Sequence, residues 1–174
     1  MGASQRRKGA RGELEACAVM ADLLGGAWTR GGSAQRRQGP DRPADIVSEA
    51  WRGLHVEVKR GQRVHLGPAY DQAVGAAAPW QLAVVLARRD RDPIGWVTVR
   101  PWLAGIDPWQ RPEDVPTLAG SRARVWGALG SAQAVWWSRG HDLLIVEHVA
   151  LGCAAIRLLW GRQPGRESVA RDET

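Results

Sequence analysis

Glu57 and Lys59 are the residues whose types and spacing most suggest chemistry. They lie two positions apart in the segment LHVEVK, where valines occupy the alternate positions. Because successive side chains of a strand point to opposite faces, the acid and the base share one face. Such a pair is also common on a strand that faces water. Further residues must therefore decide whether the pair faces water or a substrate.

Two more carboxylates precede this pair. Asp45 begins a strand predicted at 44–49, the hairpin partner of the strand at 54–59. Glu13 falls on the apolar stripe of a helix predicted at 11–24, although Glu15 occupies the side where a solvated acid belongs. Three acids converging in a half-buried site would repel one another strongly. A divalent cation removes that repulsion, and Mg²⁺ prefers oxygen ligands of this kind.

Together these residues predict metal-assisted cleavage of a nucleic-acid backbone. A bound metal would stabilise charge on a phosphodiester and lower the pKa of its water. We expect Asp45 and Glu57 to bind Mg²⁺, with Mn²⁺ as a substitute, and Glu13 to complete the site directly or through water. Lys59 would orient or deprotonate the attacking water, or steady the phosphate oxygens. The catalytic set is thus Glu13, Asp45, Glu57 and Lys59.

The charge distribution favours a polyanionic partner. The 174-residue chain carries a formal net charge of +6, and its basic residues gather in two places. One is a predicted flexible arm at residues 1–10 and the start of the helix, and the other is a Gly/Pro-rich loop at 31–43. The basic residues expected to contact DNA phosphates are Arg6, Arg7, Lys8, Arg11, Arg30, Arg36 and Arg37.

The order of these motifs resembles the PD-(D/E)XK nuclease superfamily, and more closely the archaeal-type Holliday junction resolvases and their phage relatives. The matching segments, within roughly residues 5–100, are RRKGARGELE, TRGGS, PADI and VEVK. They align Glu13, Arg30 with Ser33, Asp45, and Glu57 with Lys59 to that pattern. The resemblance implies that Ser33, like Arg30, helps to hold the DNA backbone. Gln72 in YDQAV is a further candidate, because some relatives carry a glutamine in the helix after the strand.

The resemblance implies a mixed five-stranded sheet flanked by helices, dependence on Mg²⁺, and a homodimer that nicks a four-way DNA junction symmetrically. Two features depart from the pattern. Leu14 follows the helix glutamate where family members often carry arginine, and the loop before Asp45 is longer than in the compact archaeal enzymes.

The predicted elements give an α/β fold. Helix 11–24 is followed by strands near 27–30, 44–49 and 54–59, a helix at 68–78, and strands at 80–87 and 94–100. Residues 1–105 would form the nuclease core, and 106–174 a C-terminal extension of unknown role. In that extension we expect a linker at 107–120, a helix over 121–139, a strand at 143–149, a helix or strand at 154–160 and a polar tail.

Three functional alternatives remain open. The chain is expected to be a resolvase, a related nuclease acting in repair, on flaps or in restriction, or a DNA-binding protein that keeps the fold without catalysis. We expect no membrane association, because no apolar stretch reaches the roughly 20 residues of a membrane helix. We also expect no small-molecule substrate. The expected location is the cytoplasm, or the host cytoplasm for a phage protein. His55 shares the strand face of Glu57; we interpret it as a surface histidine, with a place near the site as the alternative.

Overall fold

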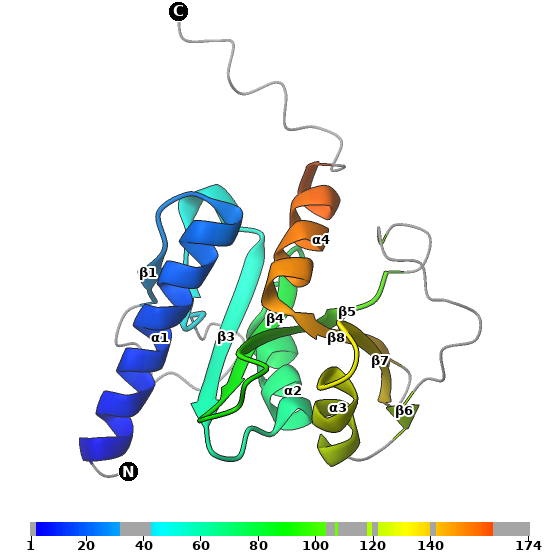
Figure 1. Ribbon diagram of the computed structural model, residues 1–174. Coiled ribbons are helices and arrows are strands. Elements are labelled where there is room, and N and C mark those ends of the chain that lie inside the picture. The colour runs from blue at the N-terminus through cyan, green and yellow to red at the C-terminus, as the bar shows by residue number, and fades with distance from the viewer. Residues whose placement is uncertain are drawn as a thin grey trace, which may run out of the picture.

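The computed structural model describes residues 3–31, 43–103, 107, 118–119, 122–139 and 142–161 (Figure 1). Within these ranges the chain forms four α-helices, one short 3-10 helix and eight strands. The elements are α1 (Ala3–Leu24), β1 (Thr29–Arg30), β2 (Ile46–Val47), η1 (Glu49–Trp51), β3 (Leu54–Gly61), α2 (Leu66–Ala76), β4 (Leu82–Arg89), β5 (Trp96–Pro101), β6 (Leu118–Ala119), α3 (Arg122–Leu129), β7 (Ala134–Arg139), β8 (Asp142–His148) and α4 (Val149–Gly161).

All strands belong to one mixed sheet in the order β1-β2-β3-β4-β5-β8-β7-β6. In the seven strands from β1 to β7 along this order, β3 and β4 form the one parallel pair. The two-residue β6 adds an eighth strand, parallel to β7, at the far edge. The expected sheet of five strands is therefore too small. Its five strands are present as β1 to β5, and β8 continues the sheet from β5.

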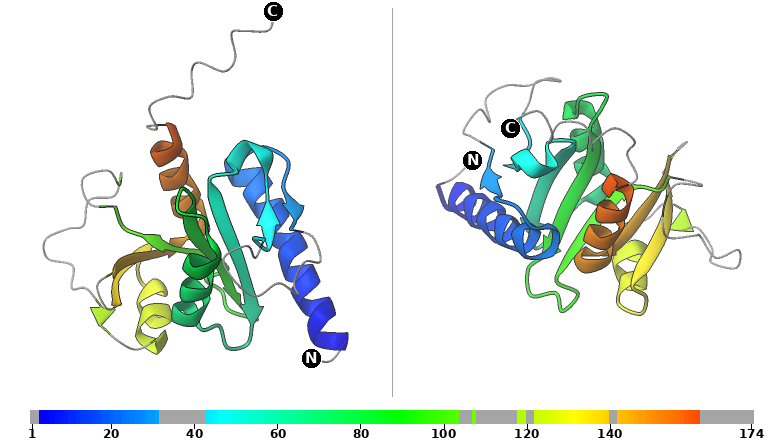
Figure 2. Two further views of the ribbon diagram at one scale, coloured as in Figure 1. Left: turned by 180° about the vertical axis from the view of Figure 1, so that it is seen from behind. Right: turned by 90° about the horizontal axis from the view of Figure 1, so that it is seen from above.

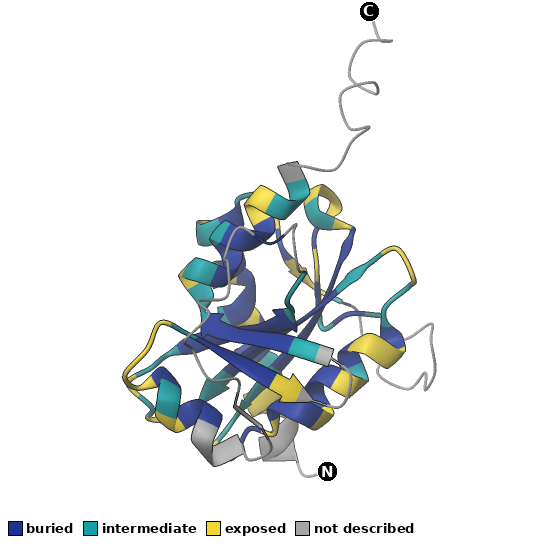
Figure 3. Cartoon of the chain, turned by 90° about the vertical axis from the view of Figure 1, so that its right-hand side faces the viewer, coloured by how far each residue is buried: buried dark blue, intermediate teal, exposed yellow. Residues whose placement is uncertain are grey.

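Helices cover both faces of the sheet (Figure 2). Helices α1 and α4 pack on one face, where Met20, Val56 and Ile156 belong to one buried apolar cluster. Helices α2 and α3 pack on the other face, where Ala73 and Val85 belong to a second cluster. Figure 3 shows the strands mostly in the colour of buried residues. Residues that alternate along β3 and β4 thus face two different cores.

Helix α1 forms because its apolar residues recur on one stripe. Ala16, Cys17, Met20 and Leu24 are all buried against the sheet. The helix ends at Gly25, whose φ of 75° is strained for residues with a side chain. The prediction of a flexible arm at residues 1–10 was wrong for residues 3–10, which form the first turns of this helix.

The C-terminal half is part of the same layered structure. Helix α4 packs against α1, and a Cβ atom at Gly53 would lie 1.8 Å from the ring of Trp160. Glycine at this position therefore lets the helix approach the start of β3. The helix predicted over 121–139 was wrong in its second half, because α3 ends at Leu129 and β7 follows the turn at Gly130. The β-branched and aromatic run AVWWSR favours a strand.

A buried charge network joins β5 to β8. The Arg100 side chain is fully buried and donates hydrogen bonds to Glu147, with 2.7 Å between Nε and Oε1, and to Asp107. Burial raises the pKa of Glu147, although the charge of Arg100 opposes that shift. The network attaches Asp107 to the centre of the sheet.

Candidate active site

The central acidic pair comes from two adjacent strands. Ile46 of β2 is paired with Val56 of β3, and the backbone N–H of Asp45 donates to the carbonyl of Val56. Because side chains alternate, Asp45 and Glu57 lie on one face of the sheet, opposite to the face of Ile46 and Val56. This is the face that α2 covers. The hairpin predicted from the sequence thus brings these two carboxylates together.

Glu57 is fully buried and is held by two side chains. Lys59 forms an ion pair with its Oε1, and the side-chain amide of Gln72 donates a hydrogen bond to the same oxygen. Lys59 is two positions along the same strand, and Gln72 comes from α2. About a third of the Lys59 side chain remains exposed (32%). The acid and the base that could be a solvated pair therefore form a largely buried contact instead.

Asp45 is fixed by the backbone of the neighbouring strand. Its Oδ2 accepts a hydrogen bond from the backbone N–H of Val58 at 2.9 Å. Val58 directly follows Glu57, so this bond places the Asp45 carboxylate beside Glu57. It also supplies an acceptor to a buried N–H group of β3, which would otherwise lack one at the end of the short β2 ladder.

Glu13 lies apart from this pair, on the helix that covers the opposite face. It is buried, as its place on the apolar stripe predicted, and its Oε2 is 2.5 Å from Nε of Arg30 in β1. No group of three His, Cys, Asp or Glu side chains among the described residues is close enough together to hold a metal ion. Of the three carboxylates expected at one metal site, Asp45 and Glu57 thus lie on one face of the sheet, and Glu13 lies on the other.

Asp45 and Glu57 fit a hard divalent cation by the chemistry of their donors. Both present carboxylate oxygens, the ligands that Mg²⁺ prefers, and Mg²⁺ usually keeps several waters while one or two carboxylates hold it. Two protein carboxylates are therefore sufficient for such an ion. Glu13 remains a candidate for an indirect role, with Arg30 as its present partner.

His55 differs from its prediction. It is buried, with 2% of its surface exposed, so its interpretation as a surface histidine was wrong. It shares the face of Glu57 and lines a hollow of about 430 Å³, which Ala76 from α2, Trp80 and Val47 also line. Its alternation with Glu57 was the sequence signal for this position, because a face covered by a helix buries every second residue.

The N-terminal basic residues are partly engaged in ion pairs. Lys8 pairs with Asp90, and Arg11 pairs with Glu15. Burial alone would raise the pKa of Glu15, but the hydrogen bond and charge of Arg60, with further cations nearby, hold it below its usual value. Arg7 is exposed. The Arg6 side chain and all of Ser33, Arg36 and Arg37 lie outside the described residues.

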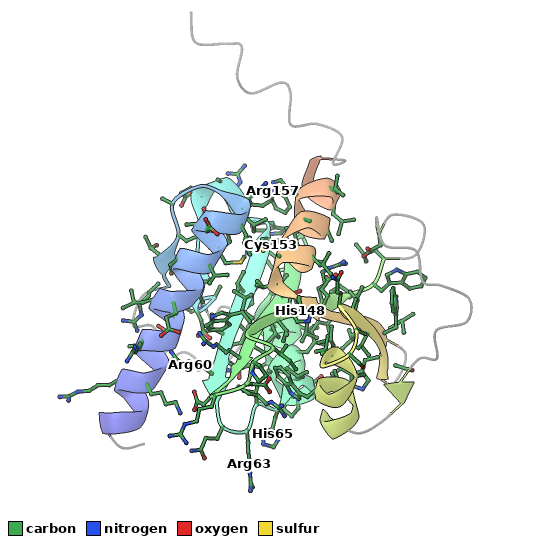
Figure 4. All side chains as sticks on the ribbon, in the orientation of Figure 1. Arg60, Arg63, His65, His148, Cys153 and Arg157 are labelled. Atoms are coloured by element: carbon green, nitrogen blue, oxygen red, sulfur yellow. The ribbon has the colours of Figure 1, made fainter. Side chains whose placement is uncertain are left out.

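A second hollow, of about 220 Å³, lies where β3 leads into α2. Its wall includes Lys59 and Gln72 from the acidic pair's surroundings, together with Arg60, Arg63 and His65. Figure 4 shows Arg63 and His65 at the end of the sheet from which α2 begins, far from Arg157 on α4. Sequence reasoning missed this basic loop, although the segment KRGQRVH that follows the acid carries its signal.

Comparison with family models, curated proteins and solved structures gives no match for this chain. Among the described helices, none combines the length and the apolar character that crossing a membrane requires. The function must therefore be inferred from the geometry of the site.

Proposed function

We propose that the chain is a metal-dependent endodeoxyribonuclease of the PD-(D/E)XK type that cuts four-way DNA junctions. The observation that carries this proposal is the buried Glu57 carboxylate, which Lys59 and Gln72 hold beside Asp45. A buried acid with a lysine partner at the rim of a hollow is unusual for a solvated strand face. It is expected where a charged group must be kept in place for chemistry.

The fold supports the proposal in its order of elements. Helix α1, the strands β1, β2 and β3, helix α2 and the strands β4 and β5 follow one another as the resemblance implies. Strands β6, β7 and β8 extend the sheet of this core on the side away from β1. The acidic pair lies where β2 pairs with β3, toward the opposite edge of the sheet.

Each residue then has a chemical task. A cation held by Asp45 and Glu57 would supply charge stabilisation at the phosphodiester and a more acidic bound water. The Lys59 ammonium, which carries three donors, would orient the attacking water or bind a phosphate oxygen. Gln72 fixes the Glu57 carboxylate through its amide, so that the acid keeps one orientation. Arg30, which pairs with Glu13 in the free protein, would exchange that acid for a DNA phosphate.

Junction specificity is part of this proposal and follows from the resemblance, which implies a homodimer. Two sites in one dimer would cut two symmetric strands of a junction. The basic character of the chain suits a partner held through phosphates, whose affinity depends on salt and not on base sequence.

The test compares a synthetic four-way junction with a matched linear duplex and a flap, in Mg²⁺ and in Mn²⁺. We expect paired nicks in opposite arms of the junction and their loss in Glu57→Gln, which keeps the shape of the side chain. Asp22→Asn, on the exposed side of α1, is the matched charge-removal control and should cut normally.

The other outcomes separate the alternatives. Equal cutting of junction, duplex and flap would retain a nuclease and discard junction selectivity. Tight junction binding without cutting in either metal would mean a DNA-binding protein, and the acidic pair would then have only a structural task.

A further inference from the structure

The small basic hollow at the start of α2 directly adjoins the acidic pair. Lys59 and Gln72 line the hollow, and both are bonded to the buried Glu57 carboxylate. Any group that enters the hollow therefore contacts the same two side chains that hold the proposed catalytic acid. The hollow is continuous with the site through these side chains.

The cations around the hollow are not equally available. The Arg60 guanidinium is paired with Glu15 and Asp90, and the Lys59 ammonium with Glu57. Arg63 is exposed, and within the described residues its guanidinium makes no hydrogen bond or ion pair.

His65 is also exposed, and it precedes α2 without forming a side-chain cap. Arg63 and His65 thus add two donors that the fold of the described residues does not use. A loop with two unused donors beside two paired cations is suited to a ligand that accepts hydrogen bonds and carries negative charge.

The size of the hollow restricts that ligand. At about 220 Å³ it is smaller than the roughly 300–1,000 Å³ of clefts that hold drug-sized molecules. Its wall combines the basic side chains with Ala69 and Pro68, and no acid of the described chain is among its lining residues. A compact anion, and in particular a phosphate group, fits this volume and this charge.

We propose that the hollow binds a backbone phosphate of the DNA strand being cut, at a linkage neighbouring the scissile one. This inference rests on the proposed function, because it assumes that the DNA strand is cut at Asp45 and Glu57. Arg63 binds the phosphate directly, and His65 adds a hydrogen bond. The subsite fixes the register of the strand, since phosphate contacts position nucleic acid without reading its sequence.

Arg63→Gln removes the positive charge and the guanidinium fork, and His65→Ala removes the imidazole donor. Both side chains are exposed, so we expect the fold to be unaffected. Arg63→Lys keeps the charge, and Arg157→Gln removes an exposed arginine on α4, at the other end of the molecule (Figure 4). We expect Arg63→Gln to lower kcat/KM on the junction about tenfold, as loss of one charge-assisted hydrogen bond implies. The dependence of log affinity on log salt should fall by about 0.9. Arg63→Lys should recover part of both effects, and Arg157→Gln should change neither.

Neutral methylphosphonate linkages locate the contact. Each linkage around the cut is replaced in turn in otherwise identical junctions. One neighbouring linkage should slow cutting by the unmodified protein about tenfold and should have no further effect in Arg63→Gln. A scan that is unchanged between the two proteins would overturn the subsite. A second set of junctions lacks the 5′-terminal phosphate. If only this change slows cutting, the subsite is also overturned, because the hollow would then bind a strand end.

The failure of this inference can be told apart from that of the proposed function. If the unmodified protein binds the junction but cuts nothing, the nuclease proposal fails, and the same scan is read from binding affinity. A single sensitive linkage that disappears in Arg63→Gln would then still support the subsite. If the protein neither binds nor cuts DNA, both proposals fall.

Discussion

Asp45 offers a prediction that separates a structural from a catalytic carboxylate. Its Oδ2 accepts the N–H of Val58 at 2.9 Å, and Val58 is buried. In Asp45→Ala this N–H loses its acceptor, which costs about 1–3 kcal/mol for a buried group. In a chain of this size that corresponds to a fall in Tm of about 2–12 °C. Asp45→Asn retains an oxygen acceptor, so its Tm should stay within about 2 °C of the unmodified protein.

Activity should follow a different order. Both Asp45→Asn and Asp45→Ala remove the negative charge next to Glu57, so each should lose about 100-fold or more in metal-dependent cutting, as seen when metal sites are disturbed. Thermal unfolding and single-turnover cleavage are measured on the same preparations. Normal cutting by Asp45→Asn would refute the reasoning, because the carboxylate would then be only an acceptor for β3. A fully stable Asp45→Ala would refute the structural part.

Two further predictions concern stability. Because the pKa of Glu15 is held below its usual 4.5, its ion pairs stabilise the fold above that pH, and this contribution is lost as the pH falls through the lowered pKa. Glu15→Gln should therefore flatten the fall of urea-unfolding free energy below pH 4.5, and an unchanged acid profile would contradict this. Arg100→Met should cost about 3–5 kcal/mol, because it leaves Glu147 buried without its cation. Adding Glu147→Leu should recover part of that loss in the same urea titrations. A cost below about 1 kcal/mol for Arg100→Met alone would mean that the buried charge network does not stabilise the fold.

The order of elements in the first hundred residues could be predicted because each has a strong local signal. Alternation defines β3, the continuous apolar run defines β4, and the glycine pair at Gly25 ends α1. The C-terminal half could not be predicted as well. Trp136 and Trp137 are neighbours on β7, so their side chains point to opposite faces of the sheet. Both are buried, which means that β7 is covered on both faces. Two adjacent tryptophans fit a buried strand and a helix equally from composition alone, and the choice depends on pairing with β8.

The candidate site, too, could be predicted from the sequence only where local geometry determines it. The spacing of Glu57 and Lys59 places them on one face, and the hairpin brings in Asp45, so three members follow from strand geometry. Gln72 was only a candidate, because its contact depends on how α2 is rotated over the sheet. Arg63 was missed, since an arginine in a loop gains a role only through the hollow that the fold builds beside it.

The repulsion between carboxylates, which suggested a metal from the sequence, is not the main force in the folded chain. Glu57 has Lys59, Glu13 has Arg30, and Asp45 has the N–H of Val58. Each acid is thus already compensated without a cation. Lys59 is also of a residue type that binds phosphate, so under the proposed function a DNA strand would compete with Glu57 for it. A phosphate that draws Lys59 away leaves Glu57 with an uncompensated buried charge, which a cation can then neutralise. We therefore expect DNA and metal to bind more tightly together than separately. By linkage the effect must be reciprocal: whatever factor DNA adds to metal affinity, the metal adds to DNA affinity.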